Sequence, residues 1–235
     1  MFEGFTKDTL KFLRQLKKNN NREWFAEQKP RYEKSVLFPA MALVEDMVNP
    51  LEKISPCFKS VSKRSGGSIM RIYRDVRFSK NKQPYKTNLG IHFRHIKGKD
   101  AHCPGFYFHV SPDEIFFAAG IWCPPNPELN KIRDLIDADP ERWKKLLRSK
   151  TIRTEFKRGG SSFQGASLKR PPRGYDAEHP LIDDLKLKDH MIAKPLTEAD
   201  LLDPKLLVNL TKNIKDSYKY VNFLCDALFC QANRS

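Results

Sequence analysis

The sequence predicts an α+β protein: a mostly antiparallel sheet of four or more strands, with helices before and after it packing on one face. Two observations predict this class. Apolar residues recur at helical spacing toward both ends of the chain, and the middle holds short runs rich in Ile, Phe, Val and Tyr. The chain has 235 residues, 40% of them apolar, enough for a core without disulfides. We expect one domain, 1–235, with a helical part at 5–60, a sheet at 68–122 and a helical and loop part at 126–230.

The first sixty residues are expected to be helical. Thr6 is a suitable N-cap for a helix whose apolar side lies within residues 10–16. The run NNN at 19–21 is suited to start the next helix, and Pro30 marks a kink or a restart. Helical spacing then continues to Pro50.

Four strands are expected in the middle of the chain. Each is a short run of β-branched and aromatic residues bounded by turn residues, and they span 68–75, 89–96, 105–111 and 114–122. Ser111, Pro112 and Asp113 form a tight connection, which indicates an antiparallel hairpin of the third and fourth strands.

Beyond the sheet, helical spacing returns. Asp139 with Pro140 is a good N-cap and first-turn pair for the second helix of this region. Residues 159–180 predict a long loop; its GGSS at 159–162 could present backbone amides to phosphate or be a flexible loop. A short strand at 190–196 and a helical stretch at 197–229 complete the chain.

Alternation along the strands separates two faces of the predicted sheet. One face is apolar and carries Ile91, Phe93, Phe106, Phe108 and Val110. The other carries Arg71, Tyr73, Asp75, Arg77, His92, Arg94, Tyr107 and His109. An antiparallel sheet often turns such a face to solvent, but a solvated face is usually Lys, Glu, Thr and Ser. The Arg, His and Tyr set, with small Ala118 and Gly120 on the fourth strand, favours a ligand pocket.

Positive charge is concentrated in two windows. The formal net charge is +15; residues 63–95 hold nine Lys or Arg against one acid, and residues 148–173 hold eight against one. The remaining residues are balanced, with 26 basic and 26 acidic side chains. Two local positive zones indicate a localised anionic partner.

The arginines of the first window suit an anion because a guanidinium offers paired donors to phosphate or carboxylate. The alternative is an internal ion pair of Asp75 with Arg74 or Arg77. Lysines of the expected loop at 79–87 either steer an anion or are ordinary loop lysines. Arg74, the exception on the apolar side of the first expected strand, is also predicted to bind. The binding residues predicted outside the strands are Lys80, Tyr85, Lys86, Arg170 and Arg173, the last two facing the pocket from the second window.

The chain shows no run of 18 apolar residues and no signal peptide, so we expect a soluble cytoplasmic protein without a membrane partner. Its five cysteines are widely spaced, which favours reduced thiols. A zinc site could be drawn from Cys103, Cys123, His102 and His109, but the spacing fits no standard pattern. We predict no metal and no cofactor.

Four stretches, taken together, resemble one family. They are NNNREWFAEQKPRYE, RIYRDVRFSKNKQPYKT, PGFYFHVSPDEIFFAAGIWCP and LKRPPRGYDAEHP, in that order. The chain resembles, over nearly its whole length, the domain-of-unknown-function family 2461 of bacteria and fungi, which has no established reaction. The resemblance implies a signature of Arg71, Arg74, Asp75, Arg77, Phe78, Lys80, Pro84, Tyr85 and Lys86, together with His109, Arg170, Pro172, Gly174 and His179.

The first functional hypothesis is a pocket for a small anionic, phosphate-bearing ligand. His109 and His179 are the candidates for a general acid or base, because imidazole titrates near neutrality, although either could be structural. No recognised catalytic motif is present, so the sequence leaves open whether the protein is an enzyme. The alternatives are a nucleic-acid-binding protein and a scaffold whose basic face meets an acidic protein. The oligomeric state is left open.

Overall fold

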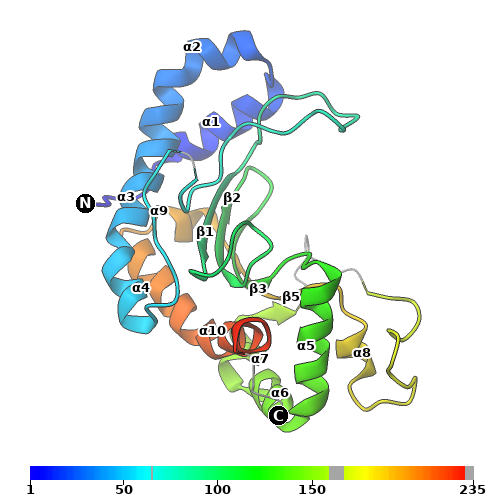
Figure 1. The fold of residues 1–235 in the computed structure, drawn as a ribbon. Helices are drawn as coiled ribbons and strands as arrows, with labels where there is room; N and C mark the ends of the chain where they lie inside the picture. The colour runs from blue at the N-terminus through cyan, green and yellow to red at the C-terminus, as the bar shows by residue number, and fades with distance from the viewer. Residues whose placement is uncertain (65, 159–166, 231–235) are drawn as a thin grey trace. The chain divides into compact units, whose positions relative to one another are not determined.

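The computed structural model describes residues 1–64, 66–158 and 167–230, and GGSS at 159–162 lies outside them. The chain divides into two compact units (Figure 1). Unit 1 comprises Met1–Phe93, Tyr107–Phe117 and Pro195–Asn213, and unit 2 comprises Arg94–Phe106, Ala118–Lys194 and Ile214–Ser235. That the whole chain forms one domain stays a prediction.

The α+β class is confirmed. The strands are β1 (Leu89–Arg94), β2 (Gly105–Val110), β3 (Ile115–Ile121), β4 (Lys157–Arg158) and β5 (His190–Leu196), in the sheet order β1-β2-β3-β5-β4. β4 pairs antiparallel with β5. The strands expected at 89–96, 105–111, 114–122 and 190–196 are thus present. The turn after β2 closes as predicted, because the Ser111 backbone N–H donates to the Glu114 carbonyl at 3.0 Å.

The helices of unit 1 are α1 (Lys7–Lys18), α2 (Arg22–Tyr32), α3 (Phe38–Asp46), α4 (Val48–Ile54) and α9 (Glu198–Leu202), with a π-helical turn, η1, at Glu33–Leu37. Of these, α1, α2 and α9 begin where the sequence predicts. The Asn21 side chain caps α2 by accepting from the Trp24 N–H at 2.9 Å. Pro30 lies inside α2, and the wider turn η1 follows it, so the predicted kink or restart takes this form.

Unit 2 contains α5 (Asn126–Ala138), α6 (Pro140–Arg148), α7 (Lys150–Glu155) and α8 (Ile182–Leu185). Asp139 caps α6 as predicted, accepting from the Arg142 N–H at 3.2 Å. The helix expected over 197–229 is divided into α9 and α10 (Leu206–Phe229). The division falls at Asp203, which is extended because the following Pro204 disfavours helical backbone at the residue before it.

The strand expected at 68–75 is wrong. Residues 69–88 form an irregular antiparallel hairpin, here called the arm, which leads into β1 and extends from it in Figure 1. Isolated bridges join Ile69 to Ile91 and Tyr73 to Tyr85. Toward the tip, backbone groups form hydrogen bonds with side chains and not with the backbone of the opposite strand. Asp75 Oδ1 accepts from the Arg77 N–H, and Lys82 donates to the Val76 carbonyl. Such bonds replace a regular ladder.

The apolar face predicted for the sheet is buried, since Ile91, Phe93, Phe106, Phe108 and Val110 are each at most 1% exposed. The space expected at Gly120 is filled by the backbone of β5. A Cβ there would lie 2.0 Å from the His190 carbonyl oxygen on β5, and Gly120 has φ +133°. Glycine at this position therefore permits the close approach of the β5 backbone.

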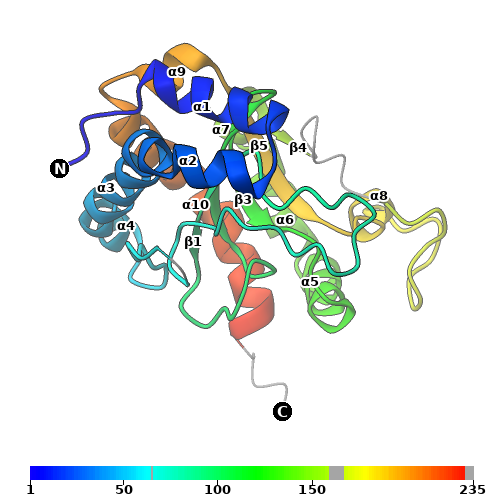
Figure 2. The ribbon, with the colours of Figure 1, turned by 90° about the horizontal axis from the view of Figure 1, so that it is seen from above.

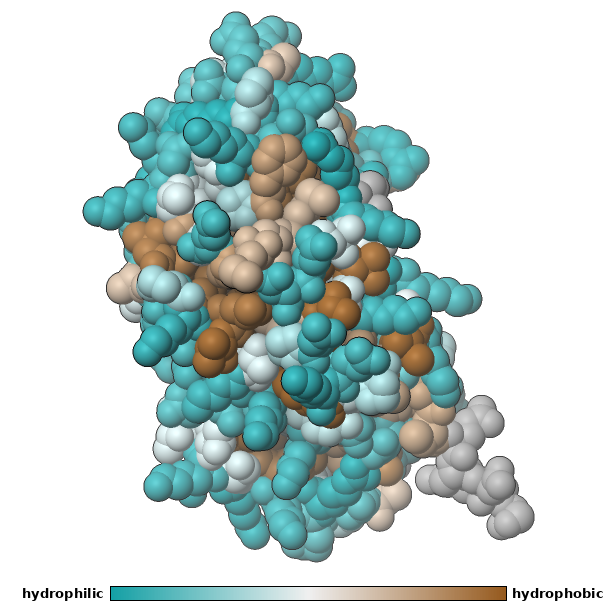
Figure 3. Space-filling view, turned by 90° about the vertical axis from the view of Figure 1, so that its left-hand side faces the viewer, coloured by the Kyte–Doolittle hydropathy of each residue, from teal (hydrophilic) through white to brown (hydrophobic). Residues whose placement is uncertain are grey.

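Apolar side chains also reach the surface of unit 1. Figure 3 shows hydrophobic side chains gathered on the face that carries α3 and α4, where Phe38 and Val48 are exposed. The Arg64 guanidinium lies 5.6 Å from the Phe38 ring centroid and partly covers it. Within the ranges that the structure describes, no helix is long and apolar enough to cross a membrane.

One carboxylate joins the first helices of unit 1. Asp8 on α1 accepts from Arg31 Nε on α2 at 2.9 Å and from the Ser35 hydroxyl on η1 at 2.6 Å. Figures 1 and 2 both show α1 and α2 side by side. The bond from Arg31 holds the pKa of the Asp8 carboxyl at about 2, below its ordinary value of 3.8.

This pair predicts an acid-dependent contribution to stability. Because the Asp8 pKa is lower in the folded protein, the pair stabilises the fold above about pH 4, and its contribution is lost as pH falls toward 2. Asp8→Asn should lower the free energy of unfolding by about 1 kcal/mol or less at pH 7, since the pair is partly exposed. Denaturant unfolding at several pH values should show the two proteins converging near pH 2.

The matched control is Asp113→Asn, which removes a more exposed pair with Lys17. It should change the profile little. Parallel profiles for wild type and Asp8→Asn down to pH 2 would contradict this role of Asp8.

Candidate functional site

The arm is attached to the helices of unit 1 at Tyr85. The Asn20 side chain, between α1 and α2, brackets the Tyr85 backbone: its Nδ2 donates to the Tyr85 carbonyl at 2.9 Å, and its Oδ1 accepts from the Tyr85 N–H at 3.0 Å. The Tyr85 ring stacks on Phe25 of α2, with centroids 4.1 Å apart. The amide of Asn20 thereby satisfies both the N–H and the carbonyl of one arm residue, as the backbone of a neighbouring strand would.

Aromatic packing extends this attachment. Phe25 also contacts Tyr32 and Tyr73, with centroids 5.4 and 6.4 Å away, and Tyr73 lies 5.5 Å from Tyr85 across the bridge. Burial raises the pKa of Tyr32 to about 12. These rings form the base of the arm, so the arm leaves the helices from a packed and defined position.

Six of the nine cations of the first charge window lie along the arm. Arg71, Arg77, Lys80 and Lys82 are exposed, and Arg74 and Lys86 are half-buried. Asp75 binds Arg77 through two bonds, 3.0 Å to Nε and 2.7 Å to Nη2, which is the internal pair that the sequence left open. Across the described ranges, no carboxylate pairs with Arg71, Arg74, Lys80, Lys82 or Lys86.

Lys86 follows Tyr85 directly on the paired part of the arm. Its backbone N–H donates to the Ile72 carbonyl at 2.7 Å, so its position follows from the pairing of the hairpin. Burial, together with the charge of Arg71, lowers the pKa of the Lys86 amine. Two positive groups therefore lie close together on the paired part of the arm.

The tip of the arm presents an aromatic ring to solvent. Phe78 is 96% exposed, and the Arg77 guanidinium lies 5.9 Å from its ring centroid. Arg74 donates to the Gln83 carbonyl at 3.2 Å, a bond that helps to close the tip. The Phe78 ring is therefore accessible to solvent beside a guanidinium group.

A second group of predicted residues lies together on β1 and β2. The Tyr107 hydroxyl is 3.2 Å from His109 Nδ1, His92 meets the Tyr107 ring edge-on, and His109 stacks on Phe116 with centroids 4.6 Å apart. Burial lowers the pKa of His109 and raises that of Tyr107. A Cβ at Gly90 would lie 2.6 Å from the Tyr107 hydroxyl, so this cluster is closely packed.

The remaining predicted residues belong to unit 2. Arg94 ends β1, and Arg170 and Arg173 are exposed in the segment before α8. His179 Nε2 lies 3.0 Å from Asp137 Oδ1, and its Nδ1 accepts from the Leu181 N–H at 3.1 Å, so both ring nitrogens have partners. That these residues face the first group across a pocket stays a prediction.

Sequence reasoning missed Asn20 and Phe25 as residues that position the site. Their stretch, NNNREWF, predicts a helix start and belongs to a motif of the family resemblance, but it does not predict a contact with the arm. The available signal was the Asn run itself: one asparagine caps α2, so the amide of its neighbour Asn20 is available to bind another segment. In the part of the chain that the structure describes, no three His, Cys, Asp or Glu side chains are grouped so that they could hold a metal ion.

Fold and site together define an α+β protein with a cation-bearing hairpin arm fixed to its N-terminal helices. The sequence model of the family described as "Conserved hypothetical protein (DUF2461)" matches residues 8–223. The chain therefore belongs to this family, as its motifs indicated. No curated protein and no solved structure matches the chain.

The bracket at Tyr85 predicts how the arm responds to a small change. Asn20→Ala removes two hydrogen bonds worth about 1 kcal/mol each, so amide hydrogen exchange at Tyr85 should accelerate by about 10-fold or more. NMR-detected exchange measures this directly.

Asn19→Ala is the matched control, because Asn19 donates only to the Gln15 carbonyl at the end of α1. It should leave Tyr85 exchange unchanged. Equal exchange rates in wild type and Asn20→Ala would show that the bracket does not hold the arm.

Proposed function

We propose that this protein binds nucleic acid through the arm, with the cations contacting phosphates and Phe78 stacking on an unpaired base. One observation carries the proposal: in the described ranges, five arm cations lack a carboxylate partner on a hairpin whose tip exposes an aromatic ring at 96%. Cations spaced along an extended element match a polyanion, and an exposed ring offers a stacking surface.

A small phosphate-bearing ligand on the same residues was the first hypothesis from the sequence. Such a ligand requires cations that converge in a concave site. The arm instead distributes its cations from Arg71 and Lys86 at the paired part to Lys80 and Lys82 near the tip. This distribution favours a long partner over a compact one. An acidic protein would meet the same charges but would give Phe78 no base to stack on.

The test is the salt dependence of binding to a fluorescein-labelled 20-nucleotide single strand, measured by anisotropy. The triple variant Arg71→Gln, Lys80→Gln, Lys86→Gln should reduce the slope of log K against log salt by about 2, or about 0.7 for each lost phosphate contact. Phe78→Ala should weaken binding about 5- to 150-fold and leave the slope unchanged, because stacking contributes about 1–3 kcal/mol.

Lys53→Gln is the control that removes one positive charge outside the arm, because Lys53 is exposed on α4 and away from the arm in sequence. It should leave the slope unchanged. Absence of binding to the single strand, or equal losses in the arm and control variants, would refute the proposal. Saturable stabilisation by inorganic phosphate that is lost in Arg71→Gln would instead favour the compact anion site.

A further inference from the structure

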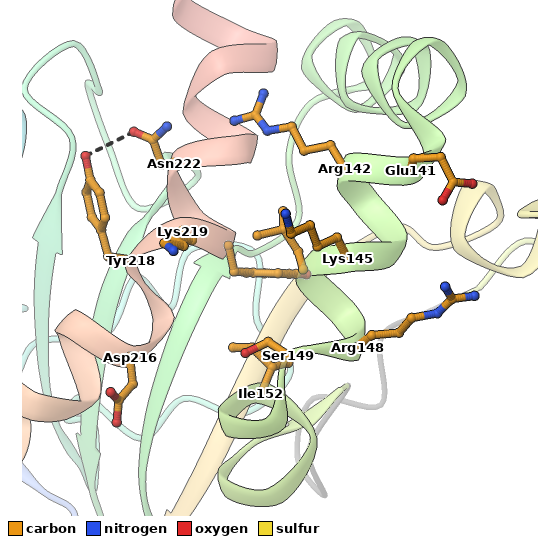
Figure 4. Close-up of a pocket in the computed structure, with 12 residues that line it drawn as sticks. Glu141, Arg142, Lys145, Arg148, Ser149, Ile152, Asp216, Tyr218, Lys219 and Asn222 are labelled. Atoms are coloured by element: carbon orange, nitrogen blue, oxygen red, sulfur yellow. Dashed lines mark hydrogen bonds between the residues drawn. The ribbon is translucent and has the colours of Figure 1, made fainter.

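A groove in unit 2 is lined by residues that belong neither to the arm nor to the sheet. It has a volume of about 760 Å³ and lies between α6 with the start of α7 on one side and α10 on the other (Figure 4). This volume is within the range typical of small-molecule sites, about 300–1,000 Å³. None of the binding residues predicted from the sequence lines it.

The groove has an apolar floor and a cationic rim. Ile152 and Tyr220 are buried in the floor, with Leu146 half-buried beside them. Lys145 and Lys219 are exposed on the rim, on α6 and α10 respectively. In Figure 4, Lys145 extends from α6 toward the space beside α10, and Ser149 adds a hydroxyl where α6 ends.

Two lining charges are already neutralised by neighbours. Arg142 donates to Asp226, and Asn222 also donates to Asp226 at 3.3 Å. Glu141 is paired with Lys144 at 2.9 Å and points away from α10 in Figure 4. The one other lining carboxylate is Asp216 on α10.

The other cations that line the groove are the two rim lysines and Arg148. Over the ranges described, no carboxylate pairs with Lys145, Lys219 or Arg148. The groove therefore keeps an excess of positive charge above an apolar floor. Lysine amines act as point charges that suit a phosphate, and an apolar floor suits the body of a molecule larger than phosphate itself.

We infer that this groove binds a small phosphate-bearing molecule, with Lys145 and Lys219 holding the phosphate and Leu146 and Ile152 contacting its uncharged part. The inference goes beyond the proposed function, because it concerns other residues, in unit 2, and another class of ligand.

The test uses pyridoxal 5′-phosphate as the probe. Its aldehyde condenses with a lysine amine, releasing water, and borohydride then reduces the imine to a stable amine that peptide mass spectrometry locates. Lys145 and Lys219 should be labelled in preference to other exposed lysines, and millimolar pyrophosphate should slow their labelling at least several-fold. Even labelling of the exposed lysines, or no protection by pyrophosphate, would overturn the inference.

Titration calorimetry with pyrophosphate provides the second measurement. Lys145→Gln and Lys219→Gln should each weaken pyrophosphate binding about 10-fold, the equivalent of about 1.4 kcal/mol. Lys144→Gln is the matched control, since the neighbouring Lys144 pairs with Glu141 and does not line the groove. Equal effects of all three substitutions would contradict a site built on the two rim lysines.

Failure of this inference is distinguishable from failure of the proposed function. The arm variant Arg71→Gln, Lys80→Gln, Lys86→Gln should leave pyrophosphate binding and its protection pattern unchanged. Conversely, Lys145→Gln and Lys219→Gln should leave the salt slope for the single strand unchanged. Loss of both activities in one set of variants would show a single shared site and overturn the assignment to the groove.

Discussion

The position of the arm depends on the side chain of Asn20. A two-stranded hairpin in water is marginally stable, so it needs a further partner to keep one position. Asn20 supplies that partner by accepting from and donating to the Tyr85 backbone, and Phe25 adds a stacked ring. The exposed cations and Phe78 are presented from this fixed base. Without the bracket, the arm would keep its ring contacts with Phe25 and its pairing with β1 but would lose its two hydrogen bonds to the N-terminal helices.

Local signals allowed much of the fold to be predicted. Short runs of β-branched and aromatic residues between turn residues identified β1, β2 and β3, because such side chains favour strands. The cap of α6 at Asp139 and that of α9 at Thr197 depend on residues within one turn and were also predictable. Pro204 signals the break before α10, although one continuous helical stretch was expected there.

The arm could not be predicted in the same way. Its pairing brings residue 72 next to residue 86, and its attachment joins residues 65 positions apart in the chain. No pattern within one strand reveals such contacts. The free space expected at Gly120 was wrong for a related reason: the strand that fills that space, β5, comes 70 residues later in the sequence. The clustering of Tyr107 with His109 followed from alternation, whereas their close packing did not.

The most direct test of the account is to map where a nucleic acid contacts the protein. A single strand carrying 5-bromouracil, crosslinked to the full chain by light and analysed by peptide mass spectrometry, reports the residues next to its bases. The account predicts crosslinks on the arm, centred on the exposed ring of Phe78. Crosslinks confined to peptides outside residues 69–88, at a salt concentration where binding saturates, would contradict it.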